Sequence, residues 1–297
     1  MTGDEMLDFV KNNFPNLKID KVKVNTQGWD NSILILNNEI VFRFPKSDEL
    51  CKKIIDGGKI LEILKSEEPI LQVPHYEYLH KDSALLGVYY SFLEGTPLIE
   101  IPKQNLKENP LNAKGIGDFL TKLHKIDISK LSDTNLTTIH TLKYWESLYL
   151  NVKREVFPFL KQQQRKEIDE VFNNFISSFP KLTYKKTVIH GDLTTSNIIY
   201  NEDKGSVYGI IDFTDAQIGD PAFDFAGLYW DFGLDFTKDV FHWYKGNESS
   251  ESLLKRVRTF YGLQPVFHEL LYAIKNNLPI NWNGVLKKFS ALYQLSK

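Results

Sequence analysis

The stretch His190-Gly191-Asp192-Leu193-Thr194-Thr195-Ser196-Asn197, followed after a gap by Ile211-Asp212-Phe213, carries more information than any other part of this sequence. Two apolar runs of β-type residues, 197–200 and 206–213, flank the polar turn 201–205, which is the pattern of a β-hairpin. If the runs pair across that turn, opposed residue numbers sum to about 408, which places residue 211 opposite Asn197. Asp212 is then expected beside Asn197, with Asp192 a few residues upstream.

Three oxygen-bearing side chains at one end of a hairpin fit the transfer of a phosphoryl group. That reaction depends on positioning and charge neutralisation, and the Mg²⁺ that bridges the phosphate oxygens prefers oxygen ligands. We expect Asn197 and Asp212 to bind the metal, and Asp192 to accept the proton of the attacking hydroxyl or to orient it. The sequence has neither a histidine pair nor a Gly-x-Ser-x-Gly elbow, which argues against zinc chemistry and Ser-His-Asp hydrolysis. Each residue alone would be a loop cap or a turn residue, and only the combination indicates catalysis.

The periodicity of the apolar residues changes once along the chain, near residue 94. Before that point the pattern predicts a short helix over 5–14, a longer helix over 48–65 that Gly57 and Gly58 weaken, and several strands. The strands are expected at Val22–Val24, Ile33–Leu36, Glu39–Phe44, Val73–Leu79 and Gly87–Leu93, with Asn37-Asn38 as a hairpin turn.

Beyond the turn-like Glu94-Gly95-Thr96-Pro97 the chain is mostly helical, and the hairpin described above, with the run Thr187–His190, is the one β interruption. The helices are expected at about 111–126, 141–156, 163–179, 221–230, 236–245, 251–260 and 265–276. We therefore predict an α+β fold of two lobes around a cleft. A small β-rich lobe is expected over 1–93 and a larger, mainly helical lobe over 94–297.

The combined motif resembles the aminoglycoside phosphotransferase family, which shares the protein-kinase fold and includes macrolide kinases. The similarity extends over essentially the whole chain. It implies that Asp192 is the catalytic base, that Asn197 and Asp212 bind Mg²⁺, and that ATP or GTP lies between the lobes. Asp224, in Gly219-Asp220-Pro221-Ala222-Phe223-Asp224-Phe225, is then expected to anchor the catalytic loop, while His190 and His124 are expected to be structural.

Nucleotide-binding residues are expected in the N-terminal lobe. In Val41-Phe42-Arg43-Phe44-Pro45-Lys46, Arg43 stands where the family usually has a Lys that contacts the α- and β-phosphates, and macrolide kinases resemble this chain in having Arg there. Lys46 is the alternative, but the period of two places it on the opposite face of the strand. The helix carboxylate that normally pairs with this cation has no clear counterpart, because Gly57 stands near its position, with Asp56 beside it and Glu62 one turn beyond.

Two further segments are expected to meet the nucleotide. The stretch 27–32 precedes Arg43 where a phosphate-covering loop belongs, with Gly28 and Ser32 as its contacts, although it has one glycine and not a Gly-x-Gly-x-x-Gly. Alone, this stretch would be an ordinary hairpin turn. The expected hinge is Tyr90–Gly95, where the backbone of Ser91 and of Leu93 should meet the base, a contact that does not discriminate ATP from GTP.

The acceptor is expected to be a small molecule with a hydroxyl group, and three classes stay open. Carboxylates would meet an aminoglycoside, and Asp231, Asp235 and Asp239 recur every four residues, although a solvated helix face explains them equally well. Lys and Arg outnumber Asp and Glu between 231 and 297, so this region is not acidic.

A macrolide would suit aromatic side chains such as Trp230, which at helical spacing are also typical of a core. In addition, Asp212-Phe213-Thr214-Asp215-Ala216 is similar to the Asp-Trp-Thr-Glu-Ala of macrolide kinases. Aminoglycosides are placed first because many family members act on them, before macrolides and metabolites such as amino alcohols or sugars.

Composition argues against several other classes of function. Lys plus Arg total 36 against 38 acidic residues, and this net charge of −2 offers no bulk field for nucleic acid or for an anionic membrane. The single cysteine, Cys51, excludes an intramolecular disulfide. The N-terminus carries acids where a signal peptide needs positive charge, and no apolar run is long enough to span a membrane.

We therefore expect a cytoplasmic monomer that inactivates an antibiotic or acts as a housekeeping kinase. The rival hypothesis is a nucleotide-binding module that has lost catalysis, and the intact Asp192, Asn197 and Asp212 argue against it.

Overall fold

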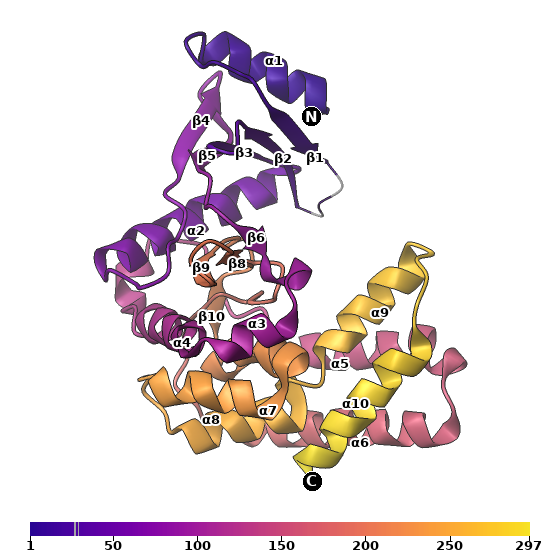
Figure 1. Cartoon of the computed structure of the whole chain (residues 1–297). Helices are drawn as coiled ribbons and strands as arrows, with labels where there is room; N and C mark the ends of the chain where they lie inside the picture. The colour runs from indigo at the N-terminus through magenta and orange to yellow at the C-terminus, as the bar shows by residue number, and fades with distance from the viewer. Residues whose placement is uncertain (27, 29) are drawn as a thin grey trace.

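A five-stranded antiparallel sheet forms the N-terminal part of the computed structural model, which describes residues 1–26, 28 and 30–297. The strand order is β1-β2-β3-β5-β4, and the sheet lies in the upper part of Figure 1. The strands are β1 (Val22–Asn25), β2 (Asn31–Leu36), β3 (Ile40–Pro45), β4 (Glu77–Lys81) and β5 (Ala84–Ser91). Asn37 and Asn38 turn the chain between β2 and β3 with φ values of 57° and 55°, as the expected two-residue hairpin requires.

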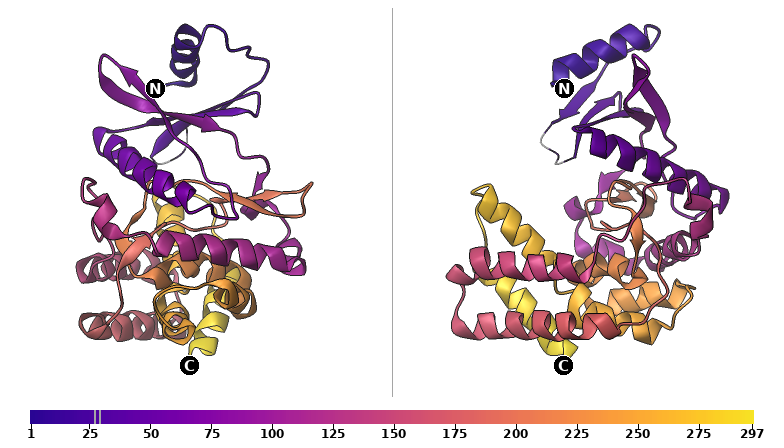
Figure 2. Two further views of the ribbon diagram at one scale, coloured as in Figure 1. Left: turned by 90° about the vertical axis from the view of Figure 1, so that its left-hand side faces the viewer. Right: turned by 180° about the vertical axis from the view of Figure 1, so that it is seen from behind.

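Two helices cover the two faces of this sheet (Figure 1). On the outer face, α1 (Gly3–Asn13) buries Met6 and Val10 against Leu34 and Phe42 in a small hydrophobic cluster. On the inner face, α2 (Asp48–Ser66) lies between the sheet and the rest of the molecule, as Figure 1 and both views of Figure 2 show. The apolar residues of α2 belong to the main hydrophobic core, which continues into the helical region.

The remainder of the chain is mainly helical, so the fold is α+β, as predicted. Its α-helices are α3 (Lys103–Glu108), α4 (Pro110–His124), α5 (Leu142–Asn151), α6 (Gln162–Ser178), α7 (Ala226–Trp243), α8 (Ser250–Arg256), α9 (Pro265–Lys275) and α10 (Trp282–Ser296). One π-helical turn extends α5 over Val152–Val156 and another extends α8 over Val257–Tyr261. Short 3₁₀ turns lie at Leu98–Glu100, Ile128–Leu131, Phe157–Phe159, Phe179–Lys181 and Pro221–Phe225.

The predicted hairpin is present between the two parts of the molecule. Strand β8 (Ile198–Asn201) pairs with β9 (Ser206–Ile210), and Ile198 opposes Ile210 as the expected register requires. The N–H of Ile211 donates to the carbonyl of Asn197 at 2.9 Å, so the same pairing register continues to Asn197 and to the residue before Asp212. On the other side of β8 lies β6 (Thr96–Pro97), whereas β7 (Thr187–Ile189) pairs separately with β10 (Gln217–Gly219).

The structure departs from the expected elements in three places. Residues 73–76 are not part of a strand, because Gln72 forms two backbone hydrogen bonds of 2.9 Å with β9 and the chain joins the sheet only at Glu77. Helix α10 had not been predicted. Gly233, with φ of 79°, interrupts α7, so the four-residue spacing of Asp231 and Asp235 does not continue along one regular helix.

Among the described residues, no helix combines the length and the apolar character that a membrane span needs. The lobe limits 1–93 and 94–297 stay a prediction.

Candidate active site

The loop that carries Asp192 is fixed from below by a buried carboxylate. One oxygen of Asp224 accepts from the backbone N–H of His190 at 2.8 Å, and the other accepts from the N–H of Gly191 at 3.0 Å. His124 of α4 places Nε2 3.0 Å from Asp224 Oδ2 and Nδ1 2.9 Å from the hydroxyl of Tyr244. Burial opposes ionisation of Asp224, but His124 and His190 hold its pKa below the ordinary value. The roles expected of Asp224, His124 and His190 agree with these contacts.

Gly191 allows the loop to turn toward the second half of the site. Its φ of 79° lies in the left-handed region, and a Cβ there would stand 2.0 Å from the carbonyl oxygen of Asp215. The side chain of His190 is buried, and its Nε2 lies 3.0 Å from the carbonyl oxygen of Ile211. The catalytic loop and the segment after β9 are therefore held against each other by backbone contacts.

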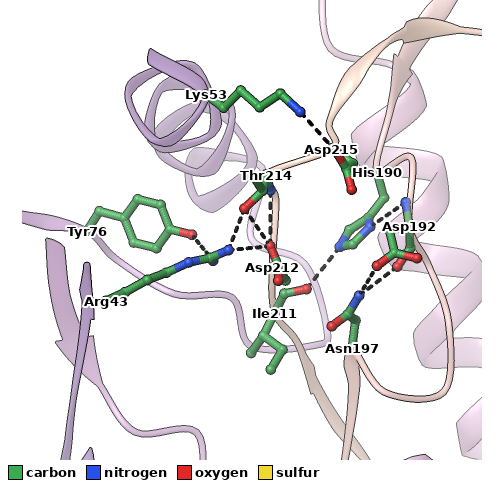
Figure 3. A network of polar contacts seen from close by, with 10 residues as sticks. All are labelled: Arg43, Lys53, Tyr76, His190, Asp192, Asn197, Ile211, Asp212, Thr214 and Asp215. Carbon is green, nitrogen blue, oxygen red and sulfur yellow. Dashed lines mark hydrogen bonds and ion pairs between the residues drawn. The ribbon is translucent and has the colours of Figure 1, made fainter. Parts of the chain in front are cut away.

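Asp192 and Asn197 form one unit within this loop (Figure 3). The amide Nδ2 of Asn197 donates to the carboxylate Oδ2 of Asp192 at 2.8 Å and to its carbonyl oxygen at 2.9 Å. Burial, together with the nearby carboxylates Asp215 and Asp212, raises the pKa of Asp192 to about 7. The amide oxygen of Asn197 has no donor among the described residues, so it is free to accept a cation.

Asp212 lies at the end of the hairpin with an uncommon backbone conformation, φ of 66°. Its Oδ1 accepts from the backbone N–H of Thr214 at 3.2 Å and from the hydroxyl of Thr214 at 2.7 Å. The same oxygen accepts from Nη2 of Arg43 at 2.6 Å (Figure 3). Burial would raise the pKa of Asp212, but Arg43 and Thr214 hold that pKa below its ordinary value. The strained backbone and the saturated oxygen show a carboxylate held in one orientation.

The position of Arg43 departs from the expectation that it contacts phosphate. Its side chain is only 2% exposed and faces Asp212. Lys46 lies beyond the end of β3 and donates to the backbone carbonyls of Thr26, at 2.9 Å, and of Gly28, so it braces the loop before β2. The sequence predicted that Arg43 and Lys46 lie on opposite faces of the strand, and their separate partners are consistent with that prediction.

Of the two residues expected from the phosphate-covering loop, Ser32 has its side chain on the wrong face. Ser32 is paired with Phe44 in the β2–β3 ladder, whereas Ile33 is paired with Arg43, so the Ser32 side chain shares the outer face with Phe44. Asn31, which had not been predicted, contacts Arg43 instead. Gly28 lies at the tip of the loop, and the neighbouring Gln27 and Trp29 lie outside the described residues.

Helix α2 approaches the site without a carboxylate at the usual position. A Cβ on Gly57 would stand 3.1 Å from the carbonyl oxygen of Phe213, so the helix backbone packs directly on the segment after β9. Asp56 is turned away and accepts from the backbone N–H of Asn135 at 3.1 and 3.2 Å. The helix contributes a cation, since Lys53 lies 3.2 Å from Asp215 Oδ1 (Figure 3).

The expected hinge lies where the chain leaves the sheet. Ser91 is the last residue of β5, and the next N–H, that of Phe92, donates to the carbonyl of Glu39 at 2.7 Å. The N–H and C=O of Leu93 have no hydrogen-bond partner in the described part of the chain. The contact of Ser91 and Leu93 with a nucleotide base stays a prediction.

Two adjoining cavities open beside Asp192. One has a volume of about 440 Å³ and is bordered by Lys53 and Asp215 as well as by α9. The other has a volume of about 680 Å³ and extends toward Trp230 and Asp231. Both are lined by Asp192, Thr194, Gly227, Pro265, His268 and Glu269. Together they form a place where an acceptor can lie with a hydroxyl next to Asp192.

The residues predicted for the acceptor site are only partly brought together. Trp230 and Asp231 line the larger cavity, but Lys288 lies over the Trp230 ring at 4.0 Å and Lys103 lies 3.1 Å from Asp231 Oδ1. Asp235 follows the break at Gly233, is exposed, and lines neither cavity. The sequence did not single out Gln264, which lines the smaller cavity and buries an Oε1 that lacks a partner among the described residues.

The donor set at this site fits Mg²⁺ bound together with a nucleotide. Asn197 offers its amide oxygen, and Asp212 offers Oδ2, which has no hydrogen-bond partner among the described residues. Burial, and after it the nearby carboxylates Asp215 and Asp212, raise the pKa of Asp192, and a divalent cation would relieve the repulsion among these carboxylates. Within the described chain, no three His, Cys, Asp or Glu residues form a metal site alone, so phosphate oxygens would complete the shell.

Comparisons with known proteins agree with this site. A family model described as "Phosphotransferase enzyme family" matches residues 21–256. YcbJ, an uncharacterised protein of Bacillus subtilis (strain 168), is 23% identical over 243 residues, which are 76% of this chain and 75% of that protein.

Solved structures support the two-lobed fold. The GDP and kanamycin complex of APH(2″)-IIIa gives a TM-score of 0.75 at 22% identity and covers 98% of both chains. Macrolide 2′-phosphotransferase type I gives a TM-score of 0.66 at 20% identity, covering 99% of this chain and 97% of that one.

Proposed function

The chain belongs to the phosphotransferase enzyme family, whose model matches residues 21–256, and on that premise we propose that it is a Mg²⁺-dependent kinase of a small molecule. The terminal phosphate of ATP or GTP is transferred to a hydroxyl of the acceptor. The observation that supports this most directly is the convergence of Asp192, Asn197 and Asp212, of which Asp192 lines the two cavities. The nucleotide complex of APH(2″)-IIIa is consistent with a nucleotide donor.

Asp192 has the position and the basicity of the residue that receives the proton of the acceptor hydroxyl. It borders both cavities, and the Asn197 amide holds one of its oxygens at 2.8 Å. A base whose pKa is raised to about 7 accepts a proton more readily than an ordinary carboxylate does. Asn197 and Asp212 would hold Mg²⁺, which when bound neutralises and orients the phosphate oxygens. The N–H and C=O of Leu93 would orient the base of the nucleotide.

The smaller cavity favours an acceptor that carries amino groups, an aminoglycoside in the first instance. Asp215 and Glu269 line it, and Glu269 has no ion pair among the described residues. The buried Oε1 of Gln264, a residue that lines this cavity, has no hydrogen-bond partner among the described residues, and a small movement of the side chain would let it accept from an ammonium or hydroxyl group. The faces of Tyr144 and Phe223 can lie against the apolar side of a sugar ring.

A macrolide acceptor is the second candidate, because the larger cavity has a mostly apolar wall. Leu98, Ile99, Ile101, Phe232 and Tyr272 line it beside Trp230. Lys103 and Lys288 pair with Asp231 there, which lowers the attraction of this cavity for a polycation. An amino alcohol or sugar acceptor stays the third possibility.

The test is acceptor-dependent release of nucleoside diphosphate by the purified chain, with ATP and with GTP, over aminoglycosides, macrolides and amino alcohols. Turnover with one class, abolished by chelation of Mg²⁺, is expected. Asp192→Ala should lower kcat by about 10³-fold while nucleotide binding persists. The control is Asp203→Asn, in the exposed turn between β8 and β9, which should leave turnover unchanged. Nucleotide binding without turnover for any acceptor would instead support a binding module.

A growth-inhibition panel of the same antibiotics in a host that expresses the chain tests the biological role. Protection against one class supports inactivation of that antibiotic. Protection against none, combined with turnover of an amino alcohol or sugar, moves the assignment to a metabolite kinase.

A further inference from the structure

Arg43 of β3 is surrounded by acceptors that leave little of its guanidinium for a phosphate. Nη2 donates to Asp212 Oδ1 at 2.6 Å and to the hydroxyl of Thr214, and Nη1 donates to the hydroxyl of Tyr76 at 3.3 Å. With its oxygen turned toward the guanidinium, the Asn31 amide accepts from Nε at 3.0 Å and from Nη2 at 2.8 Å. The side chain of Arg43 is 2% exposed, so its partners have replaced water almost completely.

The contacts of Asp212 are divided unequally between its two oxygens. Oδ1 receives Arg43 and both donors of Thr214, whereas Oδ2 has no partner in the described part of the chain. Oδ1 faces Arg43 of β3. The next residue of the chain, Phe213, packs closely against the backbone of α2 at Gly57. Such a division fixes the orientation of the carboxylate and leaves one oxygen for a ligand.

No residue of α2 competes for Arg43. The approach of Gly57 to Phe213 leaves no room for a longer side chain at that position, and Asp56 binds the backbone of Asn135. Lys53 of the same helix pairs with Asp215. The acidic partner of the strand cation is therefore the carboxylate proposed to bind the metal, and not a carboxylate of the helix.

We propose that Arg43 is a positioning residue that orients Asp212 for the metal, and that it does not bind the phosphates of the nucleotide. This inference rests on the proposed function only in taking Asp212 as a metal ligand. A residue that orients a metal ligand changes metal affinity when it is removed, whereas a phosphate-binding residue changes nucleotide affinity even without metal. The two roles therefore give different results in a binding experiment that needs no acceptor.

The experiment measures GDP and ADP binding by calorimetry, in EDTA and in Mg²⁺, for the wild type, Arg43→Met and Arg43→Lys. In EDTA, both variants should bind nucleotide within about twofold of the wild type, because no phosphate contact is lost. The gain in affinity on adding Mg²⁺ should fall by about tenfold or more in Arg43→Met. Arg43→Lys should lose part of that gain, because an ammonium cannot reproduce the forked contacts with Asp212, Thr214 and Asn31.

Thr214→Val is the second variant, and it removes a hydroxyl that anchors Asp212 without removing a charge. It should shift the Mg²⁺ dependence in the same direction as Arg43→Met and leave binding in EDTA unchanged. The proposal is overturned if Arg43→Met loses affinity in EDTA while its Mg²⁺ gain is unchanged, particularly if Arg43→Lys restores that affinity.

A double-mutant cycle in urea unfolding measures the interaction between Arg43 and Asp212 without any nucleotide. Arg43→Met and Asp212→Asn should be coupled by at least about fivefold in the unfolding equilibrium constant. A coupling of zero would contradict the proposal. If the wild type bound neither GDP nor ADP, the proposed function would fail, while the cycle would still show whether Arg43 fixes Asp212.

Discussion

Gln264 is a buried residue whose oxygen is satisfied by nothing else among the described residues. Its side chain is 2% exposed, the residue lines the smaller cavity beside Asp192, and Oε1 is buried without a hydrogen-bond partner. A buried acceptor without a partner costs about 1–3 kcal/mol, which a bound donor recovers. We therefore propose that the free protein tolerates Gln264 at a cost and that a bound acceptor supplies the missing donor.

The substitution Gln264→Met tests this role. It keeps the length of the side chain and removes the oxygen, so the free energy of unfolding should stay equal or rise by up to about 1 kcal/mol. The KM for the acceptor should rise by about fivefold, with kcat little changed, because one hydrogen bond to the bound molecule is lost. Urea unfolding and initial rates measure the two quantities.

The control for this substitution is Gln162→Met, at the exposed start of α6, which should change neither quantity. A Gln264→Met enzyme with the KM of the wild type would show that the oxygen does not face the acceptor.

At the scale of single residues, the sequence predicted that the proposed catalytic and metal-binding residues lie close together, because their geometry is local. Asp192, Asn197 and Asp212 lie on one loop and one hairpin, so spacing and register suffice to bring them together. The partner of Arg43 is Asp212, at a sequence separation of 169 residues, which no local pattern reports. Asn31 was missed, although the sequence contained a signal for it. Asn31 lies two positions before Ile33 and therefore on the same face of the sheet as Arg43.

At the scale of elements, Arg256 of α8 forms ion pairs with Asp220 and Glu248 and thereby links two segments of the chain near the loop that carries Asp192. Its guanidinium contacts both oxygens of Asp220, at 2.7 and 2.9 Å, and both oxygens of Glu248, at 2.7 Å each. Asp220 caps the 3₁₀ turn Pro221–Phe225, and that turn carries Asp224, which holds the loop. The position of the catalytic loop is thus linked to α8 through one arginine.

Arg256→Ala leaves two carboxylates without their partner, one of them buried, and should lower the free energy of unfolding by about 3–5 kcal/mol. The free energy of unfolding of Arg256→Lys should lie between those of the wild type and Arg256→Ala, since an ammonium lacks the paired donors that match a carboxylate. Urea unfolding followed by circular dichroism gives these differences.

Arg154 provides the matched control for this prediction. It is paired with Glu155 on the surface, where the two side chains are 68% and 42% exposed, so Arg154→Ala should change the free energy of unfolding by about 0.5 kcal/mol or less. If Arg256→Ala and Arg154→Ala lowered the free energy of unfolding equally, the buried ion pairs of Arg256 would contribute no more to stability than a surface pair.

The elements that sequence reasoning identified are those with a clear period, and its errors have specific causes. Helix α2 was predicted correctly despite Gly57 and Gly58, at which a Cβ would come close to the carbonyl oxygen of Phe213 and to the hydroxyl of Tyr78, respectively. The break in α7 at Gly233, with φ of 79°, falls in the gap between the expected helices 221–230 and 236–245, so only the continuation of one helix on both sides of the break was not predicted. The start of β4 was misplaced because Gln72 pairs with β9, a contact between distant segments.

At the scale of the whole molecule, α2 and the segment after it join the two lobes that the periodicity indicates. Besides Lys53 with Asp215, the N–H of Ile70 donates to Asp118 Oδ2 at 2.8 Å, and Lys122 donates to the carbonyl of Glu68 at 2.6 Å. The main core continues through this contact, since Ile54, Ile60, Leu61 and Leu64 belong to the same cluster as Trp145. Sequence periodicity shows where lobes differ, but it does not show which residues connect them.

This continuity predicts that the chain unfolds in one transition and not lobe by lobe. Separating the lobes would expose the inner face of α2, at about 1.5–3 kcal/mol for each large apolar side chain. Four such residues, Ile54, Ile60, Leu61 and Leu64, are at most 2% exposed, so the sum is comparable with the total stability of a typical domain, about 5–15 kcal/mol. An intermediate with one folded lobe is therefore expected to be unpopulated.

Two native probes report on the two lobes. Cys51, on α2, is the single thiol of the chain and is partly buried, so its rate of reaction with a thiol reagent should rise above the native rate when the N-terminal lobe opens. Tryptophan fluorescence in a Trp29→Phe variant follows the helical lobe, where Trp145 is fully buried. In urea, both probes should give the same midpoint, because the shared core must open before either signal changes. Two separated midpoints, with Cys51 exposed first, would show that α2 can leave the helical lobe and that the core is divided between the lobes.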